Sequence, residues 1–278
     1  MDRLSEAVIE APQADGQEVD EDGHLPWLPI GDTSLAKEDE AGPLLDTGGI
    51  DYQQTKVVDV PAWVLQKNRI IANNPADPEC ANFKILRTQV LQNMKKNNYK
   101  TLGIVSVSPA EGKTLVAINL AYSIAMQSQH TSLLVDLDLR KPSVHTYFDY
   151  QPEYSITDYF TGDASIQNIL FSPNTEGLVV LPGRQKVENS SELLSSRQAT
   201  ELVEELRGRY PDRIVLVDLP PLLKSDDVLA FAPYLDALLL VIESAKVKKS
   251  QLVKAMELMK GTPIIGSVLN RVNGPNTW

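Results

Sequence analysis

The fold is decided by one stretch of the chain, Val105-Ser106-Val107-Ser108-Pro109-Ala110-Glu111-Gly112-Lys113-Thr114. The apolar residues 101–105 before it have the composition of a buried strand, and residues 115–121 after it are compatible with a helix. A strand, a turn with Gly-Lys-Thr and a helix form the context that a nucleotide-phosphate loop requires. We therefore predict that backbone N–H groups and the dipole of this helix face phosphate oxygens.

The residues of this loop have individual predicted roles. Gly112 lets the backbone approach closely, Lys113 reaches the outer phosphates, and the Thr114 hydroxyl ligates Mg²⁺. One element of the common pattern is missing, because Val107 occupies the position six before Lys113 where glycine is usual. The predicted nucleotide-binding residues of the loop are Ser108, Pro109, Ala110, Glu111, Gly112, Lys113, Thr114 and Leu115.

The net charge of −11 is confined to the first part of the chain. Residues 1–50 carry 13 acidic side chains against Arg3 and Lys37, so 2 − 13 = −11, and residues 51–278 hold 24 acidic and 24 basic side chains. We expect the acidic segment to be disordered, and no basic stripe indicates nucleic-acid binding. The single cysteine, Cys80, excludes an internal disulfide and agrees with a reducing compartment.

Targeting signals and composition predict the location and the domains. The chain lacks the basic start and apolar core of a secretory signal, and no apolar run approaches the roughly 20 residues of a membrane span. We expect a cytoplasmic protein. Its predicted parts are an acidic disordered tail (residues 1–54), a linker with an amphipathic helix (55–98), a P-loop domain (99–272) and a short tail without tyrosines (273–278).

Two acidic motifs follow apolar strands downstream of the loop. Asp136 and Asp138 come after the strand at 132–135, and Asp218 ends the strand at 213–217 in the Walker B form. Carboxylates at the carboxyl ends of parallel strands lie where such sheets bind ligands. Because alternate residues of an extended segment point the same way, we expect both Asp136 and Asp138 to face the phosphates. Two solvated loop carboxylates are the alternative interpretation.

The remaining pattern alternates helices with strands. We expect a short strand and a turn within residues 55–71, a helix over 79–96 with a solvated basic face, and a helix from Thr114 to about Gln127. Further strands are expected at 178–181, 237–242 and 264–269, and further helices at 188–210 and 249–260. This order predicts an α/β fold, a three-layer α/β/α P-loop NTPase with a mostly parallel sheet.

Three motifs in this order, S-V-S-P-A-E-G-K-T, L-L-V-D-L-D-L-R-K-P and I-V-L-V-D-L-P-P, resemble those of the bacterial tyrosine autokinases that regulate exopolysaccharide and capsule synthesis. The second motif resembles the extra "A-prime" Walker box of that family. Its phosphate loop typically replaces the first glycine, as Val107 does here. The runs A-N-F-K-I-L-R-T-Q-V-L-Q and N-S-S-E-L-L resemble the subgroup linked to exosortase/PEP-CTERM loci.

The resemblance implies a fold related to the partition and septum-positioning ATPases, and ATP with Mg²⁺ as cofactors. It implies that Lys113 binds phosphates, that Thr114, Asp136 and Asp218 organise Mg²⁺, and that Asp136 or Asp138 accepts the tyrosine proton. Asn270 and Arg271 match the loop that contacts adenine in related ATPases. The implied partners are a membrane-embedded polysaccharide co-polymerase or chain-length regulator, at the inner face of the membrane, and further copies of the chain in a homo-oligomer.

The sequence departs from the family pattern in two places. Many members end in a cluster of tyrosines, whereas no tyrosine follows Tyr234 here, so we expect no self-phosphorylation on a C-terminal tyrosine tail. The family's ring-forming helix usually carries Glu-x-x-Arg-x-x-Arg, and the equivalent positions are Ala81, Lys84 and Arg87, without the glutamate.

Three functions remain open on the sequence alone. The first is an ATP-dependent tyrosine kinase acting in trans or on internal tyrosines such as Tyr99, Tyr150, Tyr154 or Tyr159. The second is an ATPase switch that associates with the membrane regulator and transfers little phosphate. The third is an adaptor that works through its acidic tail and Trp27. A partition-type ATPase ranks lower, since Ser108 lies where those proteins usually place a lysine.

Overall fold

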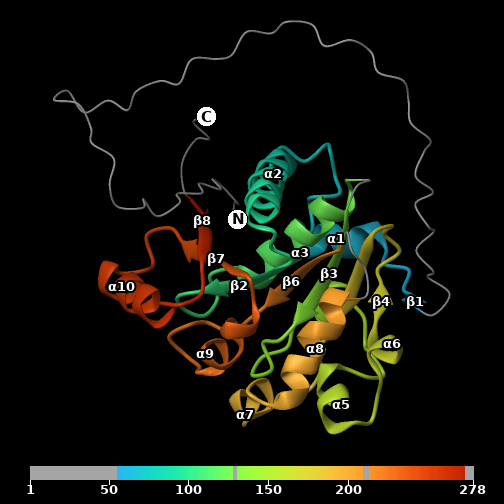
Figure 1. The fold of residues 1–278 in the computed structure, drawn as a ribbon. Helices are drawn as coiled ribbons and strands as arrows, with labels where there is room; N and C mark the ends of the chain where they lie inside the picture. The colour runs from blue at the N-terminus through green and yellow to red at the C-terminus, as the bar shows by residue number, and fades with distance from the viewer. Residues whose placement is uncertain (1–54, 128–129, 209–212, 273–278) are drawn as a thin grey trace, which may run out of the picture. The chain divides into compact units, whose positions relative to one another are not determined.

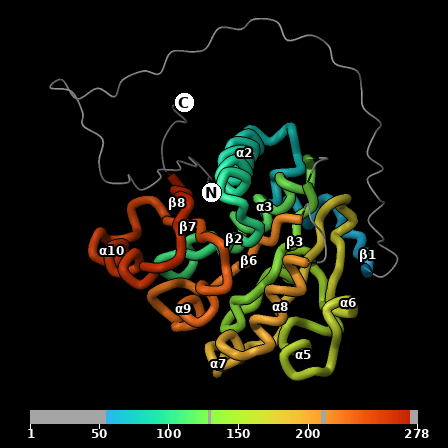
Figure 2. The backbone as a smooth tube through the Cα atoms, viewed as in Figure 1, coloured from blue at the N-terminus to red at the C-terminus, as the bar shows by residue number. Residues whose placement is uncertain are grey.

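The computed structural model describes residues 55–127, 130–208 and 213–272 (Figures 1 and 2). The predictions for the acidic tail and the last six residues lie outside these ranges. The strands are β1 (Lys56–Val57), β2 (Thr101–Ser106), β3 (Thr131–Asp136), β4 (Phe171–Ser172), β5 (Leu178–Leu181), β6 (Arg213–Asp218), β7 (Ala237–Glu243) and β8 (Ile264–Asn270). The helices are α1 (Ala62–Lys67), α2 (Cys80–Asn97), α3 (Lys113–Ala125), α4 (Val144–Tyr147), α5 (Ile156–Thr161), α6 (Ile166–Ile169), α7 (Ser190–Leu194), α8 (Arg197–Gly208), α9 (Asp227–Phe231) and α10 (Lys249–Leu258), with a short 3-10 helix η2 (Ala232–Tyr234).

The described strands form one sheet in the order β1-β4-β5-β3-β6-β2-β7-β8. The central pairs β5–β3, β3–β6, β6–β2, β2–β7 and β7–β8 are parallel, and β4–β5 is antiparallel. Neighbouring parallel strands therefore place their carboxyl ends at one edge, where Asp136 of β3 is in register with Asp218 of β6. The prediction of a mostly parallel sheet is confirmed.

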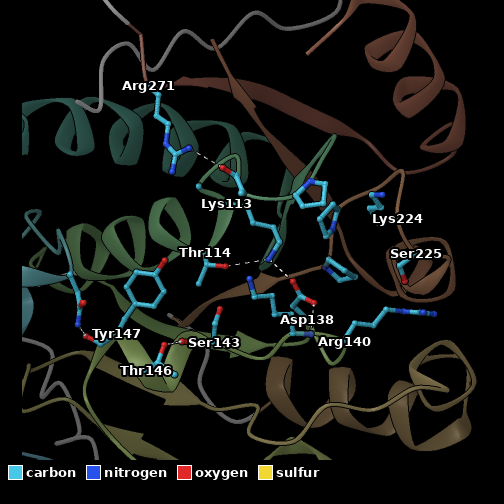
Figure 3. A pocket seen from close by; sticks show the side chains of 17 residues that line it. Lys113, Thr114, Asp138, Arg140, Ser143, Thr146, Tyr147, Lys224, Ser225 and Arg271 are labelled. Atoms are coloured by element: carbon cyan, nitrogen blue, oxygen red, sulfur yellow. Dashed lines mark hydrogen bonds and ion pairs between the residues drawn. The ribbon is translucent and has the colours of Figure 1, made fainter. Parts of the chain in front are cut away.

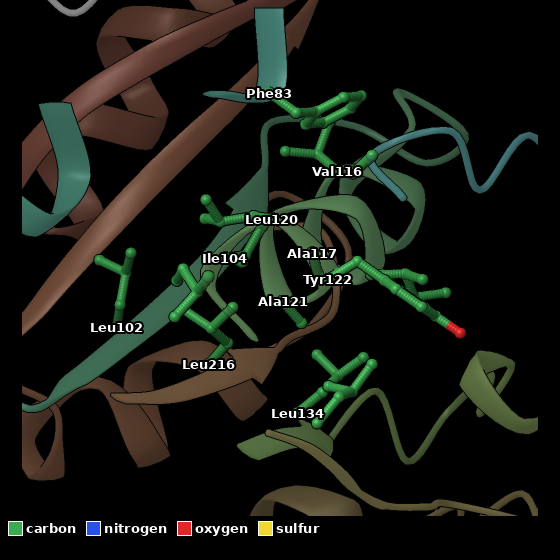
Figure 4. Packing of buried hydrophobic residues seen from close by; sticks show 14 of the residues in the cluster. Phe83, Leu102, Ile104, Val116, Ala117, Leu120, Ala121, Tyr122, Leu134 and Leu216 are labelled. Carbon is green, nitrogen blue, oxygen red and sulfur yellow. The ribbon is translucent and has the colours of Figure 1, made fainter. Parts of the chain in front are cut away.

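Helix α3 fills the centre of the molecule between the sheet and α2. On the sheet face below it, Leu102, Ile104, Leu134 and Leu216 belong to the same apolar cluster as the helix (Figure 4). Helix α2 contacts α3 from above (Figure 1). This double cover explains why α3 is apolar around its whole circumference. Its hydrophobic residues with no exposed surface are Val116, Ala117, Ile118, Leu120, Ala121, Tyr122 and Ile124.

Helix α8 contacts β6, and its buried residues do not belong to the cluster around α3. They recur at helical spacing, with Leu202, Val203 and Leu206 buried, Glu204 exposed and Glu205 partly buried. Successive side chains of β6 point to opposite faces, so the strand supplies Leu216 to the α3 side and its neighbours to the other. Helices thus cover both faces of the sheet, as predicted.

The segment before β2 is tied to α3 through one buried amide. The Asn119 oxygen accepts hydrogen bonds from the N–H groups of Ile71 (2.8 Å) and Ala72 (3.0 Å), and its nitrogen donates to the carbonyls of Arg69 and Leu115. The side chain of Asn119 is fully buried, so these four bonds satisfy a group that would otherwise be costly to bury. They fix the chain between α1 and α2 against the phosphate-loop helix.

Two predicted elements differ in the structure. Residues 62–67 form helix α1 after Pro61, rather than a turn, since proline in extended backbone is a favourable helix start. The single helix expected over 188–210 is two helices, α7 and α8. The break lies at Ser195 and Ser196, whose hydroxyls bond the carbonyls of Ser191 and Leu193, and such hydroxyls compete with the helical backbone.

Helix α2 confirms the prediction for residues 79–96, and its end is capped by Asn98 in the left-handed conformation. One part of the expected basic face is wrong. Arg87 is partly buried, and its Nη1 donates to the carbonyl of Ser123 at 2.8 Å. The arginine therefore joins α2 to α3 instead of facing solvent, because the two helices pack directly against each other.

Candidate functional site

A cavity of about 640 Å³ lies at the carboxyl ends of the parallel strands (Figure 3). This is the position at which open parallel sheets bind ligands. Its walls come from five parts of the chain far apart in sequence: the residue that follows α1, the phosphate loop, the turn after β3 with α4, the turn after β6, and the residue that follows β8. The cavity is therefore assembled by the topology of the sheet.

The phosphate loop is held from within by Glu111. The two oxygens of this buried carboxylate accept hydrogen bonds from the N–H groups of Val107 and Ser108, each at 3.1 Å. Burial raises the pKa of Glu111 to about 7, against these hydrogen bonds, which lower it. Val107 is itself fully buried, so the residue in the usual glycine position contributes to the core.

Gly112 precedes α3 in a conformation that favours glycine, with φ of +89°. A Cβ atom at this position would also collide with the side-chain nitrogen of Asn270. Ala110 is likewise in the left-handed region, with φ of +62°. Successive backbone N–H groups in turns that contain left-handed residues can form a concave surface that suits an anion.

Lys113 lies at the centre of a cluster of oppositely charged groups. Its Nζ is 2.8 Å from Asp138 and 3.3 Å from Asp218. The Thr114 hydroxyl donates to the second oxygen of Asp218 at 2.6 Å. Burial lowers the pKa of Lys113, but Asp218 and Asp138 outweigh it and raise the pKa above its usual value. The lysine is therefore a permanent cation at the cavity wall.

Asp136 and Asp138 occupy different environments. Asp136 is the last residue of β3 and is fully buried, and one oxygen accepts the N–H groups of Ser143 (2.9 Å) and Val144 (3.0 Å). Burial, and then the nearby charge of Asp218, raise its pKa to about 7. Asp138 lies in the turn beyond the strand and lines the cavity. Strand alternation does not extend to Asp138, so the two side chains do not share one direction.

The cavity brings together only part of the predicted site. Pro109, Ala110, Gly112, Lys113, Thr114, Asp138 and Arg271 line it. The residues of the predicted set that lie behind its wall or beside it are Ser108, Glu111, Leu115, Asp136, Asp218 and Asn270. Asn270 and Arg271 bind carbonyl groups of the phosphate loop, at Glu111 (2.8 Å) and Ala110 (3.1 Å).

Several lining residues were not predicted. Tyr147 of α4 and Asn68 after α1 meet at the cavity, where the Asn68 amide donates to the Tyr147 carbonyl at 2.8 Å. Arg140 and Lys141 belong to a motif that the sequence did single out, and Lys224 follows the Pro-Pro pair after β6. Asn68 and Tyr147 carry no signal in the sequence, because their place in the cavity depends on how α1 packs.

The comparisons with known proteins identify the family. No protein-family model matches the chain. The tyrosine-protein kinase YwqD of Bacillus subtilis is 32% identical over 208 residues, which cover 74% of this chain and 86% of that protein. The chain belongs to the bacterial tyrosine-protein kinases. A further member, the tyrosine-protein kinase CpsD of Streptococcus agalactiae, is 29% identical over 69% of this chain and 82% of its own length.

Solved kinase domains of this family share the fold. The kinase domain of the Escherichia coli tyrosine kinase ETK matches with a TM-score of 0.68 and 26% identity, over 80% of this chain and 93% of that one. The VpsO kinase domain matches with a TM-score of 0.64 and 30% identity, over 76% of this chain and 100% of that one. The septum site-determining protein MinD of Pyrococcus horikoshii, solved with Mg-ADP, shares the fold with a TM-score of 0.52 and 24% identity, over 61% of this chain and 69% of that one. The predicted family and fold class are confirmed.

The oxygen-rich donor set of this kinase-family site is compatible with a hard cation. Among residues 55–127, 130–208 and 213–272, no group of three or more His, Cys, Asp or Glu could hold a metal ion by itself. Mg²⁺ is commonly bound by one or two carboxylates together with substrate phosphates, so a site with few protein ligands is consistent with it. The Thr114 hydroxyl and the Asp218 carboxylate place oxygen atoms next to each other at this position. In the same ranges, no helix is long and apolar enough to span a bilayer.

Proposed function

We propose that the protein is an ATP-dependent protein-tyrosine kinase that regulates exopolysaccharide synthesis or export. The observation that carries this proposal is the Lys113 cluster, in which a phosphate-loop lysine contacts Asp138 and Asp218 at the wall of a cavity of about 640 Å³. The cavity has the size of a small-molecule site, and its loop amides suit a polyphosphate. Family membership supplies the reaction class.

The reaction is an in-line transfer to a tyrosine hydroxyl. The phenolic oxygen bonds to the γ-phosphorus of ATP, the bond from that phosphorus to the β–γ bridging oxygen breaks, and ADP leaves. Lys113 and the loop amides stabilise negative charge on the phosphate oxygens. Thr114 and Asp218 would hold Mg²⁺, which when bound neutralises charge on the phosphates.

The two carboxylates after β3 receive different roles in this proposal. Asp138 lines the cavity and is therefore the group within reach of an incoming tyrosine, whose proton it accepts. Asp136 holds the turn that carries Asp138, through the N–H groups of Ser143 and Val144. Asp136 is thus a positioning residue in this proposal. Its expected role toward magnesium would be indirect, because Asp218 beside it would hold the ion.

The proposed setting is the cytoplasmic face of the membrane, where the protein binds a membrane-embedded chain-length regulator. The solved chimerical protein CapA2B2 matches this chain with a TM-score of 0.69 and 26% identity, over 79% of this chain and 94% of that one.

We also propose that residues 55–98 belong to the catalytic domain, since Val64, Ile70 and Phe83 lie in the same apolar cluster as α3.

The experiment is incubation of purified protein with γ-labelled ATP, with Lys113→Met as the control. Label on tyrosine in the wild type, absent from the variant, supports the kinase. Free phosphate without labelled protein supports an ATPase switch instead. Binding of ATP with neither signal would favour an adaptor, and all three results can be read from one reaction mixture.

A further inference from the structure

Three consecutive carbonyl groups of the phosphate loop are each bound by a different side chain from the ends of β7 and β8. Lys246 Nζ donates to the carbonyl of Pro109 at 3.3 Å. Arg271 Nη1 donates to the carbonyl of Ala110 at 3.1 Å (Figure 3). The Asn270 amide donates to the carbonyl of Glu111 at 2.8 Å, and this bond is buried.

One carboxylate organises two of these side chains. Glu243, the last residue of β7, contacts Lys246 at 2.6 Å with one oxygen and Arg271 at 3.3 Å with the other. Burial acts to raise the pKa of Glu243, but Lys246 and Arg271 outweigh it and lower the pKa, so the carboxylate stays ionised. The strand ends are joined as well, since the N–H of Ser244 donates to the carbonyl of Asn270 at 2.8 Å.

The backbone beside these side chains is unusual for residues other than glycine. Ala245 has φ of +59° and Arg271 has φ of +58°. Left-handed backbone at a residue with a Cβ atom is unfavourable and persists only where surrounding contacts impose it. These two turns direct Lys246 and Arg271 back onto the loop, and the contacts with Glu243 and the loop carbonyls offset the unfavourable backbone.

The direction of the carbonyls fixes the direction of the amides. All peptide bonds in the described residues are trans, so the C=O of one residue and the N–H of the next point in opposite directions. Binding the carbonyls of residues 109, 110 and 111 from the side of β7 and β8 therefore turns the N–H groups of residues 110, 111 and 112 toward the opposite side. Those N–H groups belong to the segment that would contact phosphate oxygens.

We propose that Glu243, Lys246, Asn270 and Arg271 form a carbonyl clamp that presets the phosphate loop for binding the phosphates of the nucleotide. The inference rests on the proposed use of ATP and assigns a positioning role to residues at the ends of β7 and β8. It differs from the adenine contact that the family resemblance implies for Asn270 and Arg271. A clamp acts on every ligand with a polyphosphate, whereas a base contact acts only on ligands with a base.

The test compares ATP with inorganic tripolyphosphate, which has the phosphates but no base. Dissociation constants for both are measured by displacement of a fluorescent ADP analogue, in the presence of Mg²⁺, for the wild type, Arg271→Ala, Lys246→Met and Glu243→Gln. The clamp predicts that Arg271→Ala weakens both ligands by about tenfold, the effect of losing roughly one charged hydrogen bond. The double variant Arg271→Ala with Glu243→Gln should raise each dissociation constant by less than the product of the two single-variant fold-changes, because both substitutions act on one contact.

The matched control is Arg197→Ala, which removes the exposed pair with Glu201 (2.7 Å) on α8, away from the cavity, and should leave both constants unchanged. Weaker binding of ATP with unchanged binding of tripolyphosphate would overturn the clamp in favour of a base contact. Unchanged binding of both ligands in folded Arg271→Ala and Lys246→Met would overturn it as well. Because the readout is binding, a wild type that binds both ligands but labels no tyrosine contradicts the proposed function and leaves this test intact.

Discussion

The Thr114 hydroxyl donates a hydrogen bond of 2.6 Å to the Asp218 carboxylate across 104 residues of sequence. Thr114 opens α3 beside Lys113, and Asp218 closes β6, which pairs with the β2 strand that leads into the loop. The contact joins the phosphate loop to the acidic strand end in one step. The proposed magnesium site and the prediction for Asp218 depend on this contact.

We expect Asp218→Asn to abolish transfer while stabilising the fold. Burial raises the pKa of Asp218 above its usual value, against Lys113, which lowers it, so the ionised side chain is unfavourable in the folded state. A neutral amide removes that penalty, and we predict a higher free energy of unfolding for the variant at pH 8. Tyrosine phosphorylation should fall at least about 100-fold, as for loss of a catalytic electrostatic group. Urea denaturation and a phosphorylation assay on the same sample test both parts, and a variant that is less stable would contradict the first.

Asp138→Asn and Asp136→Asn should fail in different ways. Asp138→Asn is expected to lower kcat by about 10² to 10⁴, the range for loss of a general base, with little change in the affinity for ATP. Asp136→Asn should lower ATP affinity as well, since its oxygen holds the N–H groups of Ser143 and Val144. It should raise the melting temperature at pH 8, because burial raises the pKa of Asp136 to about 7 and the amide removes the buried charge. Steady-state kinetics and melting curves separate the two patterns. Equal behaviour of the variants in both measurements would argue against the separate roles.

Gly112→Ala is expected to remove ATP binding and to destabilise the fold by about 1 to 3 kcal/mol, the cost of placing a Cβ in strained backbone. The φ of +89° and the contact with the Asn270 amide both oppose the new methyl group. The double variant Gly112→Ala with Asn270→Ser should regain part of the stability, because the collision is relieved while the backbone strain stays. Calorimetry of the three proteins tests this, and the absence of any recovery would show that the collision is unimportant.

The ionisation of Glu111 should make stability depend on pH. Burial raises its pKa from 4.5 to about 7, so the folded state binds this proton more tightly than the unfolded state. The stabilising contribution is therefore complete below pH 4.5, declines as the pH rises to about 7, and is constant above that value. Relative to Glu111→Gln, which cannot ionise, the wild type should lose up to about 3 kcal/mol between pH 4.5 and pH 8. Denaturation curves at a series of pH values measure the difference, and parallel curves for the two proteins would contradict the prediction.

The sequence by itself determined the strands β2, β3 and β5 to β8, the phosphate loop and the acidic strand ends. Residues 101–106 are continuously apolar or small, and Gly112-Lys113-Thr114 begins a helix whose every side is apolar, so local pattern and burial agree. A parallel sheet then places Asp136 and Asp218 at one edge whatever the details of packing. These features follow from the hydrophobic periodicity and from the order of strands and helices, and both can be read from the sequence.

The tertiary structure alone decided which side chains reach the cavity. Asp136 turns to the amides of Ser143 and Val144, while Asp138 meets Lys113, because the strand ends between them and alternation no longer applies. Arg271 binds the loop carbonyl of Ala110, 161 residues away along the chain. Side-chain direction depends on such partners from distant segments, and a sequence pattern of period 2 or 3.6 carries no information about them.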